Sequence, residues 1–151
     1  MLEENDYKKI NYYLDENILE FASPYMPHQE IELKTFILKI IGEGSFAVEL
    51  KDGTFIGNIS VLNIIDNDTW EIAYYFNPRY WKKGYAYEAC KALIKYSFDN
   101  LKCKYLIAQI DKLNLNSRKL VEKLGFKLKN NQKNVELYGR ITNKCEYILI
   151  K

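Results

Sequence analysis

The residues with the clearest chemical potential lie in segment 80–89, which reads YWKKGYAYEA. We expect this segment between a strand and a helix, where consecutive backbone N–H groups and the helix dipole can face an anion. Gly84 would let the backbone approach a phosphate closely, and Lys82 and Lys83 add positive charge. A loop with one glycine before a helix also occurs without any ligand, and this one is neither a GxGxxG nor a Walker motif. Alone, the segment indicates a phosphate site only weakly.

Cysteine and histidine do not point to a second kind of chemistry. Cys90, Cys103 and Cys145 form no CxxC pair, and His28 is the single histidine. This pattern matches neither a disulfide framework nor a Cys/His metal cluster. Cys90 lies in an apolar pattern of helical period, which is typical of a buried small hydrophobic residue. We therefore expect no metal and a reducing, cytoplasmic environment.

Hydrophobic periodicity predicts the elements that must position segment 80–89. The expected helices cover residues 5–20, 29–41, 85–99 and 115–124. The expected strands cover residues 45–50, 54–65, 69–76 and 104–110, followed by a closing hairpin of residues 134–139 and 144–150 around Thr142 and Asn143. Asp52-Gly53 is a hairpin signal, whereas residues 69–110 read as strand, loop, helix and strand, the crossover that makes two strands parallel.

Length, composition and this order of elements indicate one mixed α/β (α+β) domain. Its 151 residues suit a single domain, and 48% hydrophobic residues can form a core. The sheet should change from antiparallel in its N-terminal half to parallel. A net charge of +2 gives no argument for nucleic-acid or membrane binding. Residues 1–20 do not resemble a signal peptide, and no apolar run approaches the ~20 residues of a spanning helix.

Three segments, in this order and spacing, resemble the GNAT acetyltransferase superfamily. They are residues 70–78 (WEIAYYFNP), residues 80–89, and residues 114–126, which carry Asn114, Ser117 and the ending KLGF. More narrowly they resemble the RimJ/RimL branch, which acetylates protein N-terminal amines. The resemblance is close over about residues 45–151 and loose over residues 2–44. It implies a GNAT-like mixed sheet with helices on both faces and with parallel strands that splay apart at the cofactor site.

The sequence departs from the family pattern at several places. Trp81 occupies a Gln/Arg position of the loop, and Lys82 replaces a frequent glycine, so its side chain must avoid the pyrophosphate or its ammonium must bind it. The strand that usually opens the fold is shortened, because only residues 1–5 precede Asp6. Val121 stands where part of the superfamily has a tyrosine proton donor.

The resemblance implies acetyl-CoA as cosubstrate, bound where strands 69–76 and 104–110 part. The pyrophosphate would lie on the N–H groups of residues 82–87, and the pantetheine arm would pair along residues 74–76. Strand N–H groups would then polarise the thioester carbonyl. The cofactor-binding residues implied in this way are Tyr74, Tyr75, Phe76, Trp81, Lys82, Lys83, Gly84, Tyr85, Ala86, Tyr87 and Asn114.

The resemblance also suggests catalytic groups for direct transfer to an amine. Glu71 is the first candidate for the general base, and Asp111 and Glu136 remain open. A surface strand glutamate paired with a lysine is an equally good reading of Glu71. Ser117 could protonate the leaving thiolate, although asparagine and serine at 114–117 also fit helix capping.

The resulting hypothesis is an acetyl-CoA-dependent N-acetyltransferase. Its acceptor amine could be a protein N-terminus, a polyamine, an aminosugar or a free amino acid. The alternative is a non-catalytic CoA-binding sensor or regulator. Residues 23–30 and 129–144 should determine the acceptor. A sheet edge left open by the short N-terminus would favour a homodimer.

Overall fold

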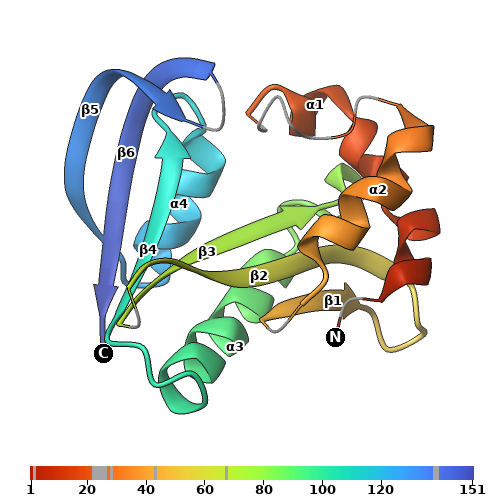
Figure 1. Cartoon of the computed structure of the whole chain (residues 1–151), viewed down its shortest axis with the longest axis horizontal. Helices are drawn as coiled ribbons and strands as arrows, with labels where there is room; N and C mark the ends of the chain where they lie inside the picture. Colours follow the sequence, from red (N-terminus) through yellow and green to blue (C-terminus); the bar gives the residue numbers. More distant parts are fainter. Residues whose placement is uncertain (2, 22–26, 28, 43, 67, 138–139) are drawn as a thin grey trace.

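A computed structural model of the chain describes residues 1, 3–21, 27, 29–42, 44–66, 68–137 and 140–151. Short helical segments come first, followed by a six-stranded sheet with its helices (Figure 1). The helical elements are η1 (Glu4–Lys9), η2 (Asn11–Leu14), α1 (Glu16–Leu19), α2 (Glu30–Ile40), η3 (Pro78–Tyr80), α3 (Tyr85–Asp99) and α4 (Leu115–Lys123). The strands are β1 (Ser45–Glu49), β2 (Phe55–Asp66), β3 (Thr69–Phe76), β4 (Tyr105–Asp111), β5 (Lys127–Leu137) and β6 (Arg140–Ile150).

The sheet changes direction at its centre, as the sequence predicts. Its strand order is β1-β2-β3-β4-β6-β5, and β3–β4 is the parallel pair, whereas the other neighbours are antiparallel. β3 and β4 pair only from Thr69 with Tyr105 to Glu71 with Ile107. Beyond Glu71 the two strands part, and Figure 1 shows β4 turning away from β3. The expected mixed sheet with splayed parallel strands is thus confirmed.

Helices cover both faces of the sheet because alternate strand residues point to opposite sides. On one face, Ile72 and Phe76 of β3 pack with Cys90 and Leu93 of α3 and with Val121 of α4. On the other face, a second cluster joins α2 and the N-terminal helices to the sheet. That cluster contains Ile10, Tyr12, Tyr13, Ile18, Leu33 and Ile37, with Phe55 and Tyr75 packed against it.

The continuous helix expected for residues 5–20 is wrong, because η1, η2 and α1 replace it. Ile10 leaves the helical conformation between η1 and η2, and Asp15 is extended and caps α1 through the N–H of Asn17 (3.0 Å). The hydroxyls of Tyr12 and Tyr13 both donate to the buried Oδ1 of Asn58 on β2. These contacts between residues far apart in sequence stabilise the three short helices, and hydrophobic periodicity does not encode them.

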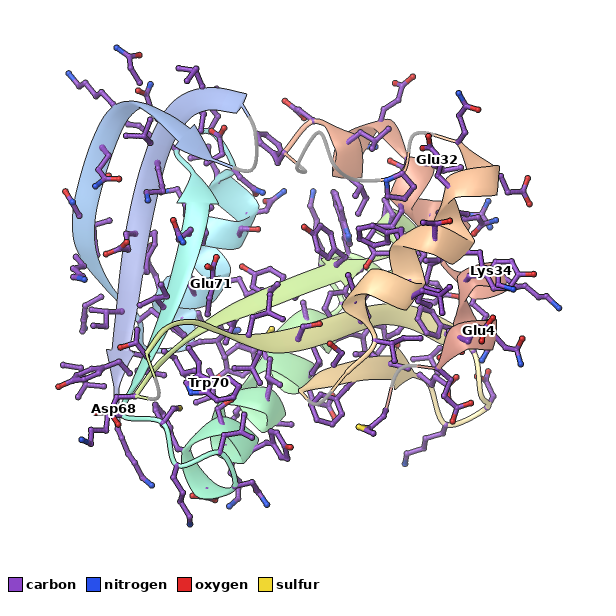
Figure 2. The ribbon with its side chains drawn as sticks, in the orientation of Figure 1. Glu4, Glu32, Lys34, Asp68, Trp70 and Glu71 are labelled. Carbon is purple, nitrogen blue, oxygen red and sulfur yellow. The ribbon has the colours of Figure 1, made fainter. Side chains whose placement is uncertain are left out.

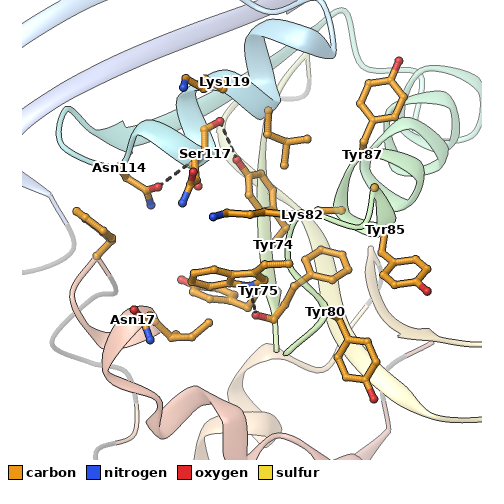
Figure 3. A pocket seen from close by; sticks show the side chains of 18 of the residues that line it. Asn17, Tyr74, Tyr75, Tyr80, Lys82, Tyr85, Tyr87, Asn114, Ser117 and Lys119 are labelled. Carbon is orange, nitrogen blue, oxygen red and sulfur yellow. Dashed lines mark hydrogen bonds between the residues drawn. The ribbon is translucent and has the colours of Figure 1, made fainter. Parts of the chain in front are cut away.

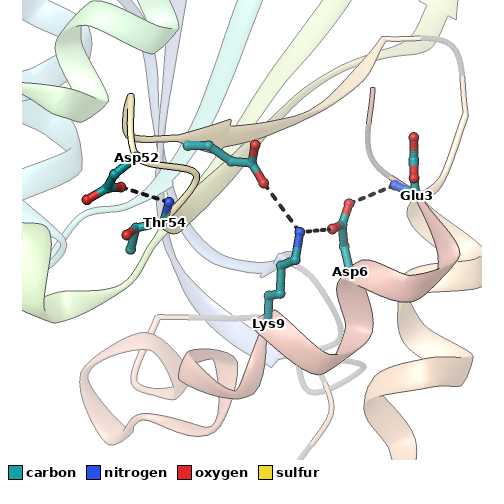
Figure 4. Close-up of polar contacts among 6 residues, drawn as sticks. Glu3, Asp6, Lys9, Asp52 and Thr54 are labelled. Atoms are coloured by element: carbon teal, nitrogen blue, oxygen red, sulfur yellow. Dashed lines mark hydrogen bonds and ion pairs between the residues drawn. The ribbon is translucent and has the colours of Figure 1, made fainter.

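Polar contacts at the edge of the sheet fix the N-terminal segment and the first hairpin (Figure 4). Lys9 Nζ lies 2.9 Å from Asp6 and 3.3 Å from Glu49 at the end of β1, so it ties η1 to the sheet. In the turn before β2, the N–H of Thr54 donates to Asp52 Oδ1 (2.9 Å), and Gly53 has φ +84°. The Asp-Gly hairpin is therefore confirmed.

The closing hairpin is present, but its predicted turn is wrong. Thr142 lies within β6 and pairs with Val135 of β5, so the ladder extends beyond the expected turn at Thr142 and Asn143. β5 begins at Lys127, seven residues before the strand expected from the sequence. Its first residues read KLKNNQK, which gives little apolar alternation, and its register shifts twice along the pair. Cross-strand pairing with β6 thus makes a strand that the pattern alone does not reveal.

Candidate functional site

A pocket of about 520 Å³ opens where β3 ends and where α3 and α4 begin (Figure 3). Of the residues expected to bind the cofactor, all except Lys83 line it. The lining residues are Asn17, Ile18, Glu20, Phe21, Tyr74, Tyr75, Phe76, Tyr80, Trp81, Lys82, Gly84, Tyr85, Ala86, Tyr87, Asn114, Asn116, Ser117, Lys119, Leu120 and Lys123. The pocket therefore joins three segments that lie far apart in sequence.

The loop from residue 81 to residue 84 is shaped to face this pocket. The indole Nε1 of Trp81 donates to the carbonyl of Phe76 (2.7 Å), which fastens the loop to the end of β3. Gly84 is the N-cap of α3 with φ +90°, and a Cβ built there would meet no atom within 4 Å. Lys82 also has a positive φ of +60°, and Figure 3 shows its side chain pointing into the pocket. The ammonium of Lys82 is thus available to an anion, as one of the two expected alternatives required.

The inner edge of β3 faces the pocket with unpaired backbone. Beyond Glu71, β4 no longer pairs with β3, while the N–H of Asn77 points the other way, to the carbonyl of Ile56 on β2 (2.9 Å). Backbone groups alternate along a strand, so those of Ile72, Tyr74 and Phe76 point into the gap. Because Trp81 bonds the Phe76 carbonyl, the N–H and carbonyl of Tyr74 and the N–H of Phe76 are the groups beyond the paired stretch with which an extended ligand could pair.

The start of α4 is held against β3 at the inner end of the pocket. Asn114 is the N-cap, and its Oδ1 accepts from the N–H of Ser117 (3.1 Å). The hydroxyl of Tyr74 donates to the carbonyl of Ser117 (3.4 Å), across the gap between β3 and α4 (Figure 3). The capping alternative for Asn114 is therefore observed, and the same contacts place the Ser117 side chain at the pocket wall.

A second, smaller cavity of about 80 Å³ continues the pocket into the gap between β3 and β4. Phe21, Tyr74, Tyr75, Asn114 and Ser117 line both cavities. The smaller cavity adds Gln109 and Asp111 of β4, together with Ile72, Ala73, Ala108 and Ile110. The two cavities thus adjoin each other, and the smaller one lies among polar side chains near the centre of the sheet.

Glu71 lies deeper than either cavity. Its side chain is 3% exposed, at the last residue pair before the strands part, and Figure 2 shows it between β3 and β4. Its Oε2 accepts from Gln109 Nε2 (3.0 Å), and Gln109 Oε1 in turn accepts from Lys144 Nζ (2.8 Å). The alternative of a surface glutamate paired with a lysine is therefore wrong, because Glu71 is buried and Lys144 is linked to it through Gln109.

Asp111 is the carboxylate that lines the smaller cavity, and it is 8% exposed. Its Oδ1 accepts from the N–H of Leu113 (2.9 Å), and its Oδ2 accepts from the hydroxyl of Thr142. The side chain of Glu136, the third candidate base, lies outside the described part of the structure. Residues 23–26 and His28 of the expected acceptor segment 23–30 also lie outside it.

Burial keeps the phenols and the thiol of this region neutral. It raises the pKa of Tyr75 to about 12, with a smaller contribution from the negative charge of Glu71. Burial also raises the pKa of Tyr74, against the lowering effect of its hydrogen bond to Ser117. The pKa of Cys90 is raised to about 12 by burial. At neutral pH the site therefore offers hydroxyl donors but no thiolate nucleophile.

Two lysines that sequence reasoning missed also line the pocket. Lys119 and Lys123 lie on α4, and Lys123 Nζ is 4.6 Å from the centroid of the Tyr87 ring at the start of α3. Their spacing of four residues puts both on one helical face, which is the signal that could have revealed them. Lys83, in contrast, points its Nζ toward the Tyr80 ring (5.3 Å).

Within the described ranges, no group of three or more His, Cys, Asp and Glu side chains could hold a metal ion. None of the helices in the described part of the chain has the length and apolarity needed to cross a membrane.

Comparison with known sequences agrees with this geometry. The family model described as acetyltransferase (GNAT) domain matches residues 1–127. The chain is 32% identical over 119 residues to the uncharacterized N-acetyltransferase YnaD of Bacillus subtilis (strain 168). This match covers 77% of the chain and 69% of YnaD. It spans 48% to 61% of the length of three further curated relatives.

Solved structures show the same fold. A GNAT-family acetyltransferase from Bacillus anthracis superposes with a TM-score of 0.90 at 27% identity, over 99% of this chain and 91% of the other. A spermidine N-acetyltransferase SpeG variant from Vibrio cholerae gives a TM-score of 0.78 at 21% identity, over 99% and 92%, a likeness that shows the fold alone. Since the family model covers most of the sequence and the parted strands match the fold, the chain belongs to the GNAT family and is an acetyl-CoA-dependent acyltransferase.

Proposed function

We propose that the protein transfers the acetyl group of acetyl-CoA directly to a primary amine. The observation that carries this proposal is the path outlined by the two adjoining cavities. One end has lysines and helix N–H groups, the middle has an unpaired strand edge, and the inner end has the buried carboxylate of Asp111, with Glu71 behind Gln109. Such a path suits a long ligand with phosphates at one end and a reacting carbonyl at the other.

Acetyl-CoA would lie with its pyrophosphate on the N–H groups of residues 82–87 and near the ammonium of Lys82. Lys119 and Lys123 add positive charge on the opposite wall. The pantetheine arm would pair with β3 at Tyr74 and Phe76, which places the thioester beside Asn114 and Ser117. Lys83, which faces Tyr80, contributes charge to the loop and no direct contact.

Glu71 is the proposed base. It stands where the strands part and bonds Gln109, which lines the smaller cavity, and the proton of the amine would pass to its carboxylate through a water in that cavity. Asp111, which lines the cavity, is the competing carboxylate. Ser117 is the proposed donor to the leaving thiolate. Ser117 is expected to contribute less to the rate than Glu71, because the thiolate of a thiol with a pKa of ~8.5 leaves readily at neutral pH without protonation.

The acceptor class is a primary amine, with a protein N-terminus, as in the RimJ/RimL branch, as the first choice. A polyamine or aminosugar is the second choice, and one structural neighbour is named a spermidine N-acetyltransferase. We place the protein in the cytoplasm as one acetyltransferase domain over residues 1–151. A homodimer through a sheet edge stays a prediction, and sedimentation across a range of concentrations tests it.

The deciding experiment follows thiol release from acetyl-CoA with a panel of amines. The wild-type protein should turn over at least one amine, and failure with every class would instead favour a CoA-binding regulator. Glu71→Gln should lower kcat/KM about 10²–10⁴-fold, the span of general acid–base catalysis. Ser117→Ala should lower it less. If Asp111→Asn shows the large loss and Glu71→Gln stays near wild type, the base is Asp111.

A further inference from the structure

The side chains of Lys144, Gln109 and Glu71 are joined by two hydrogen bonds, and their chemistry permits only one direction of donation. An ammonium group can only donate hydrogen bonds and an ionised carboxylate can only accept them, whereas a side-chain amide does one at each end. Lys144 Nζ donates to Gln109 Oε1 (2.8 Å), so the amide must present Nε2 to Glu71 (3.0 Å). A flipped amide would place an acceptor against the carboxylate and a donor against the ammonium.

The strands of the sheet put these three side chains on the same face. Glu71 pairs with Ile107 and Asp111 pairs with Lys144, and residues 107, 109 and 111 of β4 share one side. Gln109 lines the smaller cavity, whereas Glu71 lies behind it. The neighbouring ionisable groups are Tyr75 on β3, Asp111 on β4 and Glu146 on β6, which forms an ion pair with Lys129 (3.0 Å).

We infer that Gln109 and Lys144 are positioning residues for the base: Lys144 orients the Gln109 amide, and the amide holds the Glu71 carboxylate at the end of the cavity. This inference rests on the proposed function, since it concerns how that site holds its base. No other neutral side chain of this length combines one acceptor and one donor, so Gln109 cannot be replaced by glutamate or methionine without loss of the arrangement.

The first test uses variants that keep side-chain length. Gln109→Met and Lys144→Met should each lower kcat at least tenfold, while the Kd for CoA, measured by calorimetry, changes less than twofold. Lys144→Arg, which restores a donor cation, should recover most of the activity. Lys104→Met is the matched control, because it removes an ammonium just before β4 that forms an ion pair with Asp68 (2.8 Å) and lines neither cavity, and it should leave kcat unchanged.

Double variants separate positioning from general support of the fold. If Gln109 and Lys144 act through Glu71, either methionine variant should add less than threefold to the loss already caused by Glu71→Gln. Losses that multiply in full, or a Lys144→Met variant with wild-type kcat, would overturn the inference. So would a Glu71→Gln variant with wild-type kcat, in which case acetyl transfer itself still stands.

A readout that needs no turnover keeps the inference apart from the proposed function. The side-chain amide protons of Gln109, assigned by their loss in Gln109→Met, should exchange slowly with water in NMR spectra. Lys144→Met should make them exchange fast, whereas Lys104→Met should not. If no amine is acetylated, the proposed function fails, and unprotected Gln109 protons in the wild-type protein would independently overturn the inferred arrangement.

Discussion

Lys82 combines an unfavourable backbone conformation with a positive charge at the pocket. Its φ of +60° lies in the left-handed region, which disfavours side chains by about 1–2 kcal/mol. A glycine at this position would avoid that cost. In this chain the side chain instead reaches the pocket, where its ammonium can meet a phosphate. Backbone stability and cofactor affinity are therefore set against each other at this position.

Lys82→Gly should stabilise the fold by up to about 1 kcal/mol and weaken CoA binding several-fold, because it removes both the strained side chain and the ammonium. Lys102 has nearly the same φ of +58° and does not line the pocket, so Lys102→Gly is the matched control. It should give a similar stabilisation with an unchanged Kd. Urea unfolding and calorimetry measure both quantities, and an unchanged Kd in Lys82→Gly would remove this lysine from the binding site.

The buried thiols predict a decline of stability in mild alkali. Burial raises the pKa of Cys90 to about 12 and also raises that of Cys103, from an ordinary value of 9.0. Above pH 9 the unfolded chain loses these protons first, so the free energy of unfolding should fall by up to about 1.4 kcal/mol per thiol per pH unit. The double variant Cys90→Ala/Cys103→Ala should flatten this decline between pH 9 and 10. An equal slope in both proteins would contradict this origin.

At the scale of elements, the sequence predicted those whose pattern is local. α2, β3, α3 and α4 end within a residue or two of their expected limits, because a regular apolar period and terminal glycine or asparagine residues define them. The N-terminal helices and β5 were not predictable in this way. The N-terminal helices depend on the hydrogen bonds that Tyr12 and Tyr13 donate to Asn58. The polar strand β5 depends on its pairing with β6.

The same division holds for the site. The loop and strand residues expected to bind the cofactor follow from family resemblance, and all of them except Lys83 line the pocket. Their role in cofactor binding stays a prediction. Neither the burial of Glu71 nor its contact with Gln109 could be predicted, because both depend on the point at which β3 and β4 stop pairing. Lys144 joins the site only because β6 lies next to β4, thirty-five residues beyond Gln109.

Asn114 joins two elements, so its loss should affect both stability and binding. Asn114→Ala removes the cap of α4 and should cost about 1 kcal/mol of stability. The first turn of α4 carries Ser117, so the KM for acetyl-CoA should rise as well. Asn116→Ala, in the same turn but without the cap, should leave thermal stability near that of the wild type. If both variants behave alike, capping is not the role of Asn114.

At the scale of the molecule, a bound cofactor would bridge the two halves of the sheet. Two clusters of apolar side chains lie on opposite faces, and Trp81 packs against both beside the pocket. A ligand that fills the gap stabilises the folded state through mass action, by about 2.7 kcal/mol at one hundred times its Kd.

CoA at that concentration should therefore raise the Tm by about 5–10 °C for a chain of this size. Pantetheine lacks the phosphates that the lysines and the α3 N-terminus would bind, so at equal concentration it should raise the Tm much less. Thermal unfolding followed by fluorescence measures both shifts. Equal shifts for CoA and pantetheine would place the phosphates outside the pocket.

The gap between β3 and β4 also affects the tendency of the protein to aggregate. An exposed strand edge usually invites other chains to pair with it and so promotes aggregation. Here an unpaired stretch of β3 lies inside the sheet, with β4 and α4 opposite it, where an extended ligand can enter but the broad sheet of another molecule cannot. The fold can thus leave a strand edge unpaired for its cosubstrate, while other copies of the protein cannot pair with that edge.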